Sequence, residues 1–141
     1  MGLMTAIEVG ASGLTAQRRR MEVLMGNLVN ANTTKPAGTE PFRRKDVLFA
    51  PANVQTSFGA ALDEAAQGVE ISRIVTDSRE PLKKPEPGHE HADKDGYVLY
   101  PNIDPMEEMV NVLSATRSYE ANLQAVNMAK EMQQKTLEIL R

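Results

Sequence analysis

The chain has 141 residues, of which 41% are hydrophobic, and a net charge of −3 that arises from 16 Lys+Arg and 19 Asp+Glu. This length fits one soluble domain or one elongated element, and the slight acidic excess argues against nucleic-acid binding driven by whole-domain charge. The absence of cysteine excludes disulfides, cysteine-ligated zinc and thiol chemistry. With three Phe, three Tyr and no Trp, aliphatic residues and eight Met must form the core, which favours long helices over a sandwich or barrel.

Neither a membrane span nor a secretory signal is predicted. No stretch reaches the roughly 18 apolar residues that a span needs. At the N-terminus the basic cluster Arg18–Arg20 follows the mildly apolar stretch, whereas a signal peptide places its positive charge first. If the protein leaves the cytoplasm, we expect it to do so without a cleaved signal.

Residues 1–34 are expected to form a helical N-terminal arm. Apolar residues recur at intervals of three and four from Leu3 to Leu28, which is typical of an amphipathic helix. Thr5 followed by Glu8 forms a capping-box pattern at the start of this arm. The arm also contains Gly10, Gly13 and Gly26. Each glycine costs about 1 kcal/mol relative to Ala, so these positions indicate close backbone approach, a local break or fraying.

Residues 35–103 form a proline-rich middle that is expected to contain only a small β patch and loops. Phe42–Phe49 and Val69–Asp77 show partial alternation and β-branched residues, and Tyr97–Tyr100 is a short extended candidate. Pro81–Gly88 is expected to be extended or a loop.

Residues 104–141 are expected to form one long helix. Asp104 is a suitable N-cap, Pro105 fits the first helical position, and Glu107 completes a capping-box pattern. From Met106 onward neither Pro nor Gly occurs, and apolar residues alternate by three and four as in a coiled coil. Such a helix would be on the order of 55 Å long. Two amphipathic helices can pair, but they cannot fully bury their stripes, which indicates further partners in a bundle or a polymer.

One cluster has the composition of a metal site: His89, His91, Asp93 and Asp95. Its spacing resembles the opening of a calcium loop, but Tyr97 stands where the third ligand should be. A solvated loop is therefore the favoured interpretation. Ser12 lacks the glycine spacing of a nucleophile elbow, and the glycines form no phosphate-binding loop. We expect no catalytic residue, no metal site and no cofactor.

Two basic clusters, Arg18–Arg20 and Arg43–Lys45, leave two interpretations open. A nucleic-acid patch is one, but no stacking aromatic residues interleave the arginines. In the other interpretation, the arginines lie on a solvated helix face or form ion pairs between subunits. The absence of a recognised binding motif favours this second interpretation.

Both ends of the chain carry recognisable motifs. Ala11–Arg18 and Asn27–Thr34 resemble the N-terminal motif of bacterial flagellar rod and hook proteins, and Arg117–Asn122 and Asn127–Lys130 resemble the C-terminal motif of that family. The family motif positions are Asn27, Asn30, Asn32, Thr33, Tyr119, Glu120 and Asn122.

Motifs in the middle of the chain, residues 35–103, point to one kind of member within this family. Pro87–Asp93 and Gly96–Asn102 resemble a proximal-rod member of the family, and the resemblance covers nearly the whole chain with its motifs in the right order. It implies a mainly α fold in which the long N- and C-terminal helices pair as an antiparallel coiled coil around a small β/loop middle. The His89–Asp95 loop would then be a subunit-specific recognition loop.

The resemblance further implies a structural, non-enzymatic subunit of the flagellar proximal rod. It would polymerise through its terminal helices into the periplasm-spanning drive shaft and export channel. Its partners would be itself, the other proximal-rod subunits, the export-gate/MS-ring adaptor protein and the flagellar type III export apparatus, with no nucleic acid and no membrane insertion. The alternative is a soluble coiled-coil adaptor or secretion accessory protein, which fits the long helix but not the paired terminal motifs.

Under this interpretation the apolar stripes pack between subunits. The expected packing residues are Leu14, Met21, Leu24, Leu28, Met109, Val112, Tyr119, Leu123, Val126 and Leu137.

Overall fold

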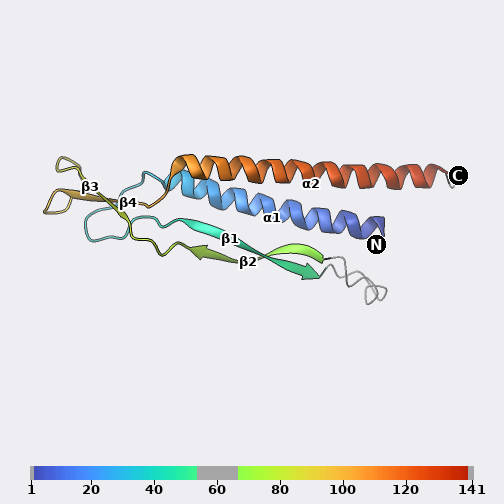
Figure 1. Cartoon of the computed structure of the whole chain (residues 1–141), viewed down its shortest axis with the longest axis horizontal. Coiled ribbons are helices and arrows are strands. Elements are labelled where there is room, and N and C mark those ends of the chain that lie inside the picture. Colours follow the sequence, from blue (N-terminus) through green and yellow to red (C-terminus); the bar gives the residue numbers. More distant parts are fainter. Residues whose placement is uncertain (1, 54–66, 140–141) are drawn as a thin grey trace.

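The computed structural model describes residues 2–53 and 67–139. Its elements are α1 (Leu3–Asn30), β1 (Lys45–Asn53), β2 (Gln67–Thr76), β3 (Leu82–Pro85), β4 (Tyr97–Tyr100) and α2 (Pro105–Ile139). The molecule is elongated, with α1 as a middle layer that contacts α2 on one side and the β1–β2 ribbon on the other (Figure 1). The β3–β4 pair lies at the end remote from the chain termini. Two long terminal helices with a small β middle confirm the predicted arrangement in outline.

The two helices run in opposite directions, so both chain ends lie at the same end of the molecule (Figure 1). The contacting pairs, in order along α1, are Gly10–Val126, Gly13–Asn122, Met21–Thr116 and Asn27–Glu108. The α2 number falls as the α1 number rises, so the antiparallel pairing covers most of α1. At 35 residues against 28, α2 is the longer helix, and it extends past the N-terminal end of α1.

Two of the three α1 glycines are sites of close helix approach. A Cβ placed on Gly10 would lie 2.5 Å from Cγ2 of Val126, and one on Gly13 would lie 2.9 Å from Nδ2 of Asn122. Both distances are shorter than real Cβ contacts, so an added Cβ would force the branched Val126 side chain to shift at Gly10 and the Asn122 amide to shift at Gly13. Gly26 has no neighbour within 4 Å of such a Cβ, so close approach is wrong as an explanation there.

The start of α2 is as predicted. Asp104 Oδ1 accepts a hydrogen bond from the Met106 N–H at 2.9 Å, and Pro105 is the first helical residue. This is side-chain capping of an otherwise unpaired helix donor. Glu107 lies in the first turn, where its negative charge favours the helix N-terminus.

The predicted start of α1 is wrong. The helix begins at Leu3 with Gly2 as N-cap and without a side-chain capping bond. Thr5, the expected cap, lies inside the first turns and is buried. Packing of this turn overrides the local Thr-x-x-Glu capping pattern, which is a weak preference of about 1 kcal/mol.

The middle forms two antiparallel hairpins. β1 pairs with β2 with Lys45 opposite Thr76, and a register shift between Leu48 and Phe49 marks a bulge. β3 pairs separately with β4. The predicted strands are confirmed, with the first displaced toward Asn53, and the extended Pro81–Gly88 segment contains β3.

The hydrophobic core is narrow. Its buried apolar residues are Ala16, Leu24, Ala31, Val47, Val98, Ile103, Ala115 and Val126. Alanines make up three of these eight, so the core buries little large aliphatic surface. Within the described ranges, no helix combines the length and the hydropathy of a membrane-crossing segment.

Candidate assembly surface and its polar junction

A buried polar junction joins α1, the start of β1 and α2. Asn27 is 0% exposed and Glu108 is 1% exposed. The Asn27 amide donates to Glu108 Oε2 at 2.9 Å, and the Arg44 Nε–H donates to Glu108 Oε1 at 2.7 Å. A buried carboxylate requires such partners because removing it from water is costly.

The Asn27 side chain pairs with the backbone of β1 as a neighbouring strand would. Its Nδ2 donates to the Lys45 carbonyl at 2.7 Å, and its Oδ1 accepts from the Lys45 N–H at 2.9 Å. An amide side chain has two donors and one acceptor oxygen, so the remaining donor is the one that reaches Glu108. A carboxylate or an aliphatic side chain cannot supply this combination.

Arg44 completes the junction from the segment before β1. Its guanidinium bonds Glu108 and also Asp46 Oδ2 at 3.2 Å. Burial alone would lower the pKa of Arg44, but the hydrogen bonds and charges of Glu108 and Asp46 outweigh it and raise that pKa. Arg44 therefore stays charged in the junction, and the two side chains depend on each other as partners.

The sequence alone predicted a functional role for only one of the three junction residues. Asn27 was expected as a motif residue, whereas Arg44 was grouped with a solvated or intersubunit cluster and Glu108 was not singled out. The available signal was position: Glu108 precedes Val112 by four and Ala115 by seven residues, so a charged residue occupies the α1-facing side of α2.

The opposite face of α2 exposes several large apolar side chains. Among the described elements α2 packs only against α1. Its outward apolar side chains, all more than half exposed, are Met106, Val110, Leu113, Met128, Met132 and Ile139. They form two groups, one toward each end of α2, with the polar residues Arg117, Glu120 and Gln124 between them on the same face. Exposed apolar groups of this kind mark protein–protein contacts.

The expected packing residues divide into three groups by exposure in the single chain. Leu24 and Val126 are buried between the helices. Half-buried positions are Leu14, Met21, Leu28, Val112 and Tyr119. Met109, Leu123 and Leu137 are exposed. Their packing between subunits stays a prediction.

The motif positions outside the junction serve smaller local roles. The Asn30 amide donates to the Gly26 carbonyl at 2.8 Å near the end of α1. Asn122 is half-buried opposite Gly13. Tyr119 is half-buried, whereas Asn32, Thr33 and Glu120 are exposed.

The His89–Asp95 loop makes structural hydrogen bonds. His89 Nδ1 accepts from the His91 N–H at 3.0 Å, and His91 Nδ1 lies 2.8 Å from Thr34 Oγ1. Asp93 Oδ1 accepts from the N–H groups of Asp95 and Tyr97, which closes the turn before β4. Within residues 2–53 and 67–139, no three His, Asp or Glu side chains gather as a metal site.

The two basic clusters differ. Arg43 and Arg44 bind within the chain: Arg43 bonds Glu40 at 3.1 Å, and Arg44 belongs to the junction. Arg18 and Arg19 are exposed on α1, where Arg19 pairs with Glu22 at 2.7 Å. Arg43 and Arg44 of the second cluster thus pair with acidic residues of the same chain, whereas Lys45 is exposed. Ion pairs between subunits stay a prediction for the exposed residues of both clusters.

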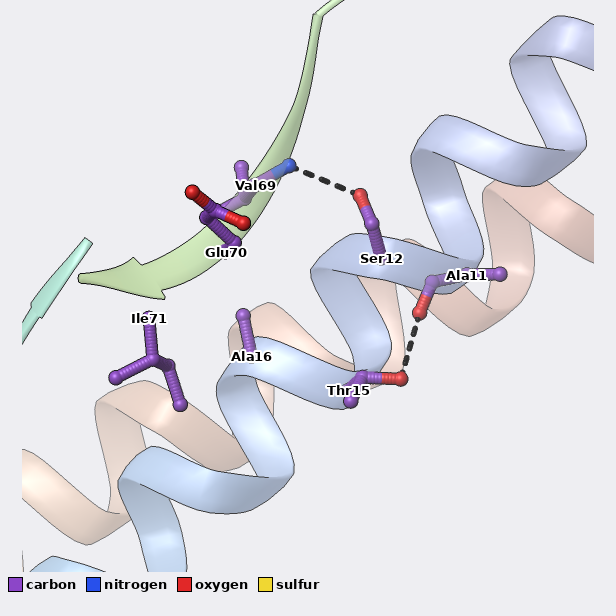
Figure 2. A pocket seen from close by; sticks show the side chains of 7 residues that line it. All are labelled: Ala11, Ser12, Thr15, Ala16, Val69, Glu70 and Ile71. Atoms are coloured by element: carbon purple, nitrogen blue, oxygen red, sulfur yellow. Dashed lines mark hydrogen bonds between the residues drawn. The ribbon is translucent and has the colours of Figure 1, made fainter. Parts of the chain in front are cut away.

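A groove of about 400 Å³ lies between α1 and β2 (Figure 2). Ser12 Oγ accepts from the Val69 N–H at 3.0 Å and donates to the Val9 carbonyl at 2.7 Å, which holds β2 against the helix. The groove is mostly apolar and is lined by Ala11, Ser12, Thr15, Ala16, Val69, Glu70 and Ile71. Small α1 side chains leave this space unfilled.

The chain has the form of an assembly subunit. It is elongated, its terminal helices pair, the polar junction holds β1 to both helices, and α2 exposes apolar side chains on its outward face. Two family models match it: flagella basal body rod protein over residues 7–36, and the C-terminal region of flagellar basal body rod FlgEFG proteins over residues 94–139. The chain is 40% identical to the flagellar basal-body rod protein FlgC of Borreliella burgdorferi, over 99% of both chains. It is 38% identical to the FlgC of Salmonella typhimurium, over 97% of both, and 39% identical to that of Bacillus subtilis, over 95% of both.

The chain is therefore a flagellar basal-body rod protein. It belongs to the FlgC family, whose members are structural rod subunits and not enzymes. This confirms the resemblance inferred from the terminal motifs and favours it over a soluble coiled-coil adaptor.

Proposed function

We propose that this chain polymerises through its terminal helices into the proximal part of the flagellar rod. The observation that carries the proposal is the outward face of α2, which exposes apolar side chains although the opposite face packs on α1. In a tube of such subunits, the α1–α2 pairs would associate as antiparallel coiled coils, and the α2 faces would be covered by neighbouring subunits.

The polar junction supports a mechanical role. A drive shaft transmits torque only if its subunits resist internal bending. Asn27, Arg44 and Glu108 tie both helices to the start of β1 by hydrogen bonds of 2.7–2.9 Å, so the β1–β2 arm moves with the helix pair. The wall of paired helices would also enclose the channel through which more distal subunits are exported.

The partners and location follow from the family resemblance. The subunit is exported by the flagellar type III apparatus without a cleaved signal peptide and assembles in the periplasm. It contacts other proximal-rod subunits and the export-gate/MS-ring adaptor protein. The His89–Asp95 loop at the end remote from the termini acts as a subunit-specific contact.

Electron microscopy of basal bodies from a deletion strain tests this function. We expect membrane rings without rod or hook, with normal flagella restored by the wild-type gene. Complete flagella on the deletion strain would contradict the proposal.

A further inference from the structure

The C-terminal end of α2 carries an apolar stripe beyond most of its pairing with α1. Val126 faces Gly10, and α1 begins at Leu3, so only Leu3–Val9 of α1 remain to lie beside the helix from Asn127 onward, and the last turns of α2 extend beyond them. We call Asn127–Ile139 the α2 end segment. Met128 and Met132 are four residues apart and therefore share a face, with exposures of 64% and 58%.

The α1–β2 groove has the properties that such a stripe requires. Its α1 wall presents Ala11 and Thr15, whose hydroxyl is already bonded to the Ala11 carbonyl at 3.1 Å. Its β2 wall presents Val69 and Ile71, with the Ile71 side chain directed toward the helix (Figure 2). Methionine is the side chain best able to fill an irregular apolar space, because it is unbranched and flexible.

The two surfaces offer one pair of opposite charges. Glu70 borders the groove and is exposed. Lys135 lies three residues after Met132 and seven after Met128, so its ammonium extends from the same face as the methionines. With the methionines in the groove, that cation would lie near the acidic rim.

We propose that the α1–β2 groove receives the α2 end segment of a second copy of this chain, with Met128 and Met132 in the groove and Lys135 near Glu70. This inference rests on the proposed rod function and names one of its subunit contacts. Groove and segment are different surfaces, so the contact is heterologous and can repeat from copy to copy. Such a contact adds further copies in a ring or a helical assembly, whereas two end segments that met each other would give only a dimer.

Disulfide cross-linking tests the contact cleanly, because the chain contains no cysteine. Two differently tagged copies, one carrying Ala11→Cys and the other Met132→Cys, are expressed together, and purified basal bodies are oxidised. We expect a disulfide between the two tags and no disulfide-linked dimer when either variant is expressed alone. Met106→Cys is the control, because Met106 is also exposed on α2 but lies at its other end, and it should not cross-link to Ala11→Cys.

Charge reversal adds an independent measurement. Glu70→Lys or Lys135→Glu alone should lower the cross-link yield about two- to fivefold, as expected for a rim ion pair, and the two together should restore it. Equal cross-linking to Met106→Cys, homodimers of Met132→Cys alone, or no cross-link in basal bodies that contain the chain would overturn this contact and leave the rod function intact. Absence of the chain from basal bodies would contradict the rod function and the contact together.

Discussion

The amide of Asn27 donates a hydrogen bond to the carboxylate of Glu108 at 2.9 Å, between residues 81 positions apart in the chain. Both side chains are inaccessible to solvent. Because the same amide pairs with the Lys45 backbone, this bond fixes the register of α1 against α2 and the position of β1 against both. One buried bond thus couples the three layers that an assembling subunit must present together.

Removal of the Glu108 carboxylate should be strongly destabilising. Glu108→Ala leaves the Arg44 guanidinium without its main counter-charge in a largely buried position, and breaking such a pair costs about 3–5 kcal/mol. The urea midpoint followed by circular dichroism of the purified chain measures the effect. Arg44→Met combined with Glu108→Leu should recover most of the loss, because no uncompensated charge remains. A double variant as unstable as Glu108→Ala would contradict the assigned pairing.

Asn27 should tolerate neither loss nor conversion of its amide. Asn27→Ala removes all three hydrogen bonds and leaves the Lys45 N–H and carbonyl unpaired, at about 1–3 kcal/mol for each buried group. Asn27→Asp keeps the shape but loses both donors and places a second carboxylate beside Glu108. We expect Asn27→Asp to be at least as destabilising as Asn27→Ala in urea titrations at neutral pH. A near-wild-type midpoint for Asn27→Asp would show that shape alone matters at this position.

Replacing the α1 glycines by alanine should change the stability of the chain in opposite directions at different positions. Gly10→Ala and Gly13→Ala should destabilise the chain, because the added Cβ would lie 2.5 Å from Val126 and 2.9 Å from the Asn122 amide. Gly26→Ala should stabilise it by about 0.5–1 kcal/mol, because nothing lies within 4 Å and alanine is the better helix former. Thermal unfolding of the three variants measures the difference, and a uniform stabilisation would disprove the close helix approach.

The lowered pKa of Asp77 leads us to expect that the free energy of unfolding decreases modestly in acid. The Arg79 N–H and then the Arg79 guanidinium hydrogen-bond the Asp77 carboxylate and lower its pKa. A carboxyl whose pKa is lower in the folded state contributes stability above its unfolded pKa, about 3.9, and loses it as the pH falls through the lower folded value. Asp77→Asn should therefore flatten the pH dependence of the unfolding midpoint below about pH 4. An unchanged acid profile in this variant would rule out the assigned ion pair as its source.

The features that sequence reasoning predicted are those encoded locally. Asp104 and Pro105 define the start of α2 through capping chemistry that needs no other part of the chain. The uninterrupted helix formers after Met106 define its length, and short β-branched runs define the strands. Terminal motifs identified the family, because they recur in fixed order.

The features that it missed depend on distant residues. Glu108 gains its role from Arg44 and Asn27, which lie 64 and 81 positions away. The helix face was also hard to predict, because Ala115 and Asn122 occupy α1-facing positions and carry little hydrophobic signal, whereas the more hydrophobic Leu123 is exposed. The spacing of the apolar residues of α2 therefore indicates a face beside the one that contacts α1. The groove exists only once β2 lies against α1.

Leu123, an expected packing residue that is exposed on α2, gives the most direct functional prediction. Leu123 is 41% exposed, so Leu123→Asp should leave the subunit folded and place a charge where a neighbouring subunit packs. Because burying an unpaired carboxylate in an apolar contact is costly, we expect the variant to be produced but non-motile. Soft-agar swimming, with protein levels from immunoblots, measures this. Leu28→Asp should also abolish swimming, but with loss of the chain's own stability, because Leu28 is half-buried on α1. Normal swimming by Leu123→Asp at wild-type levels would remove Leu123 from the subunit interface.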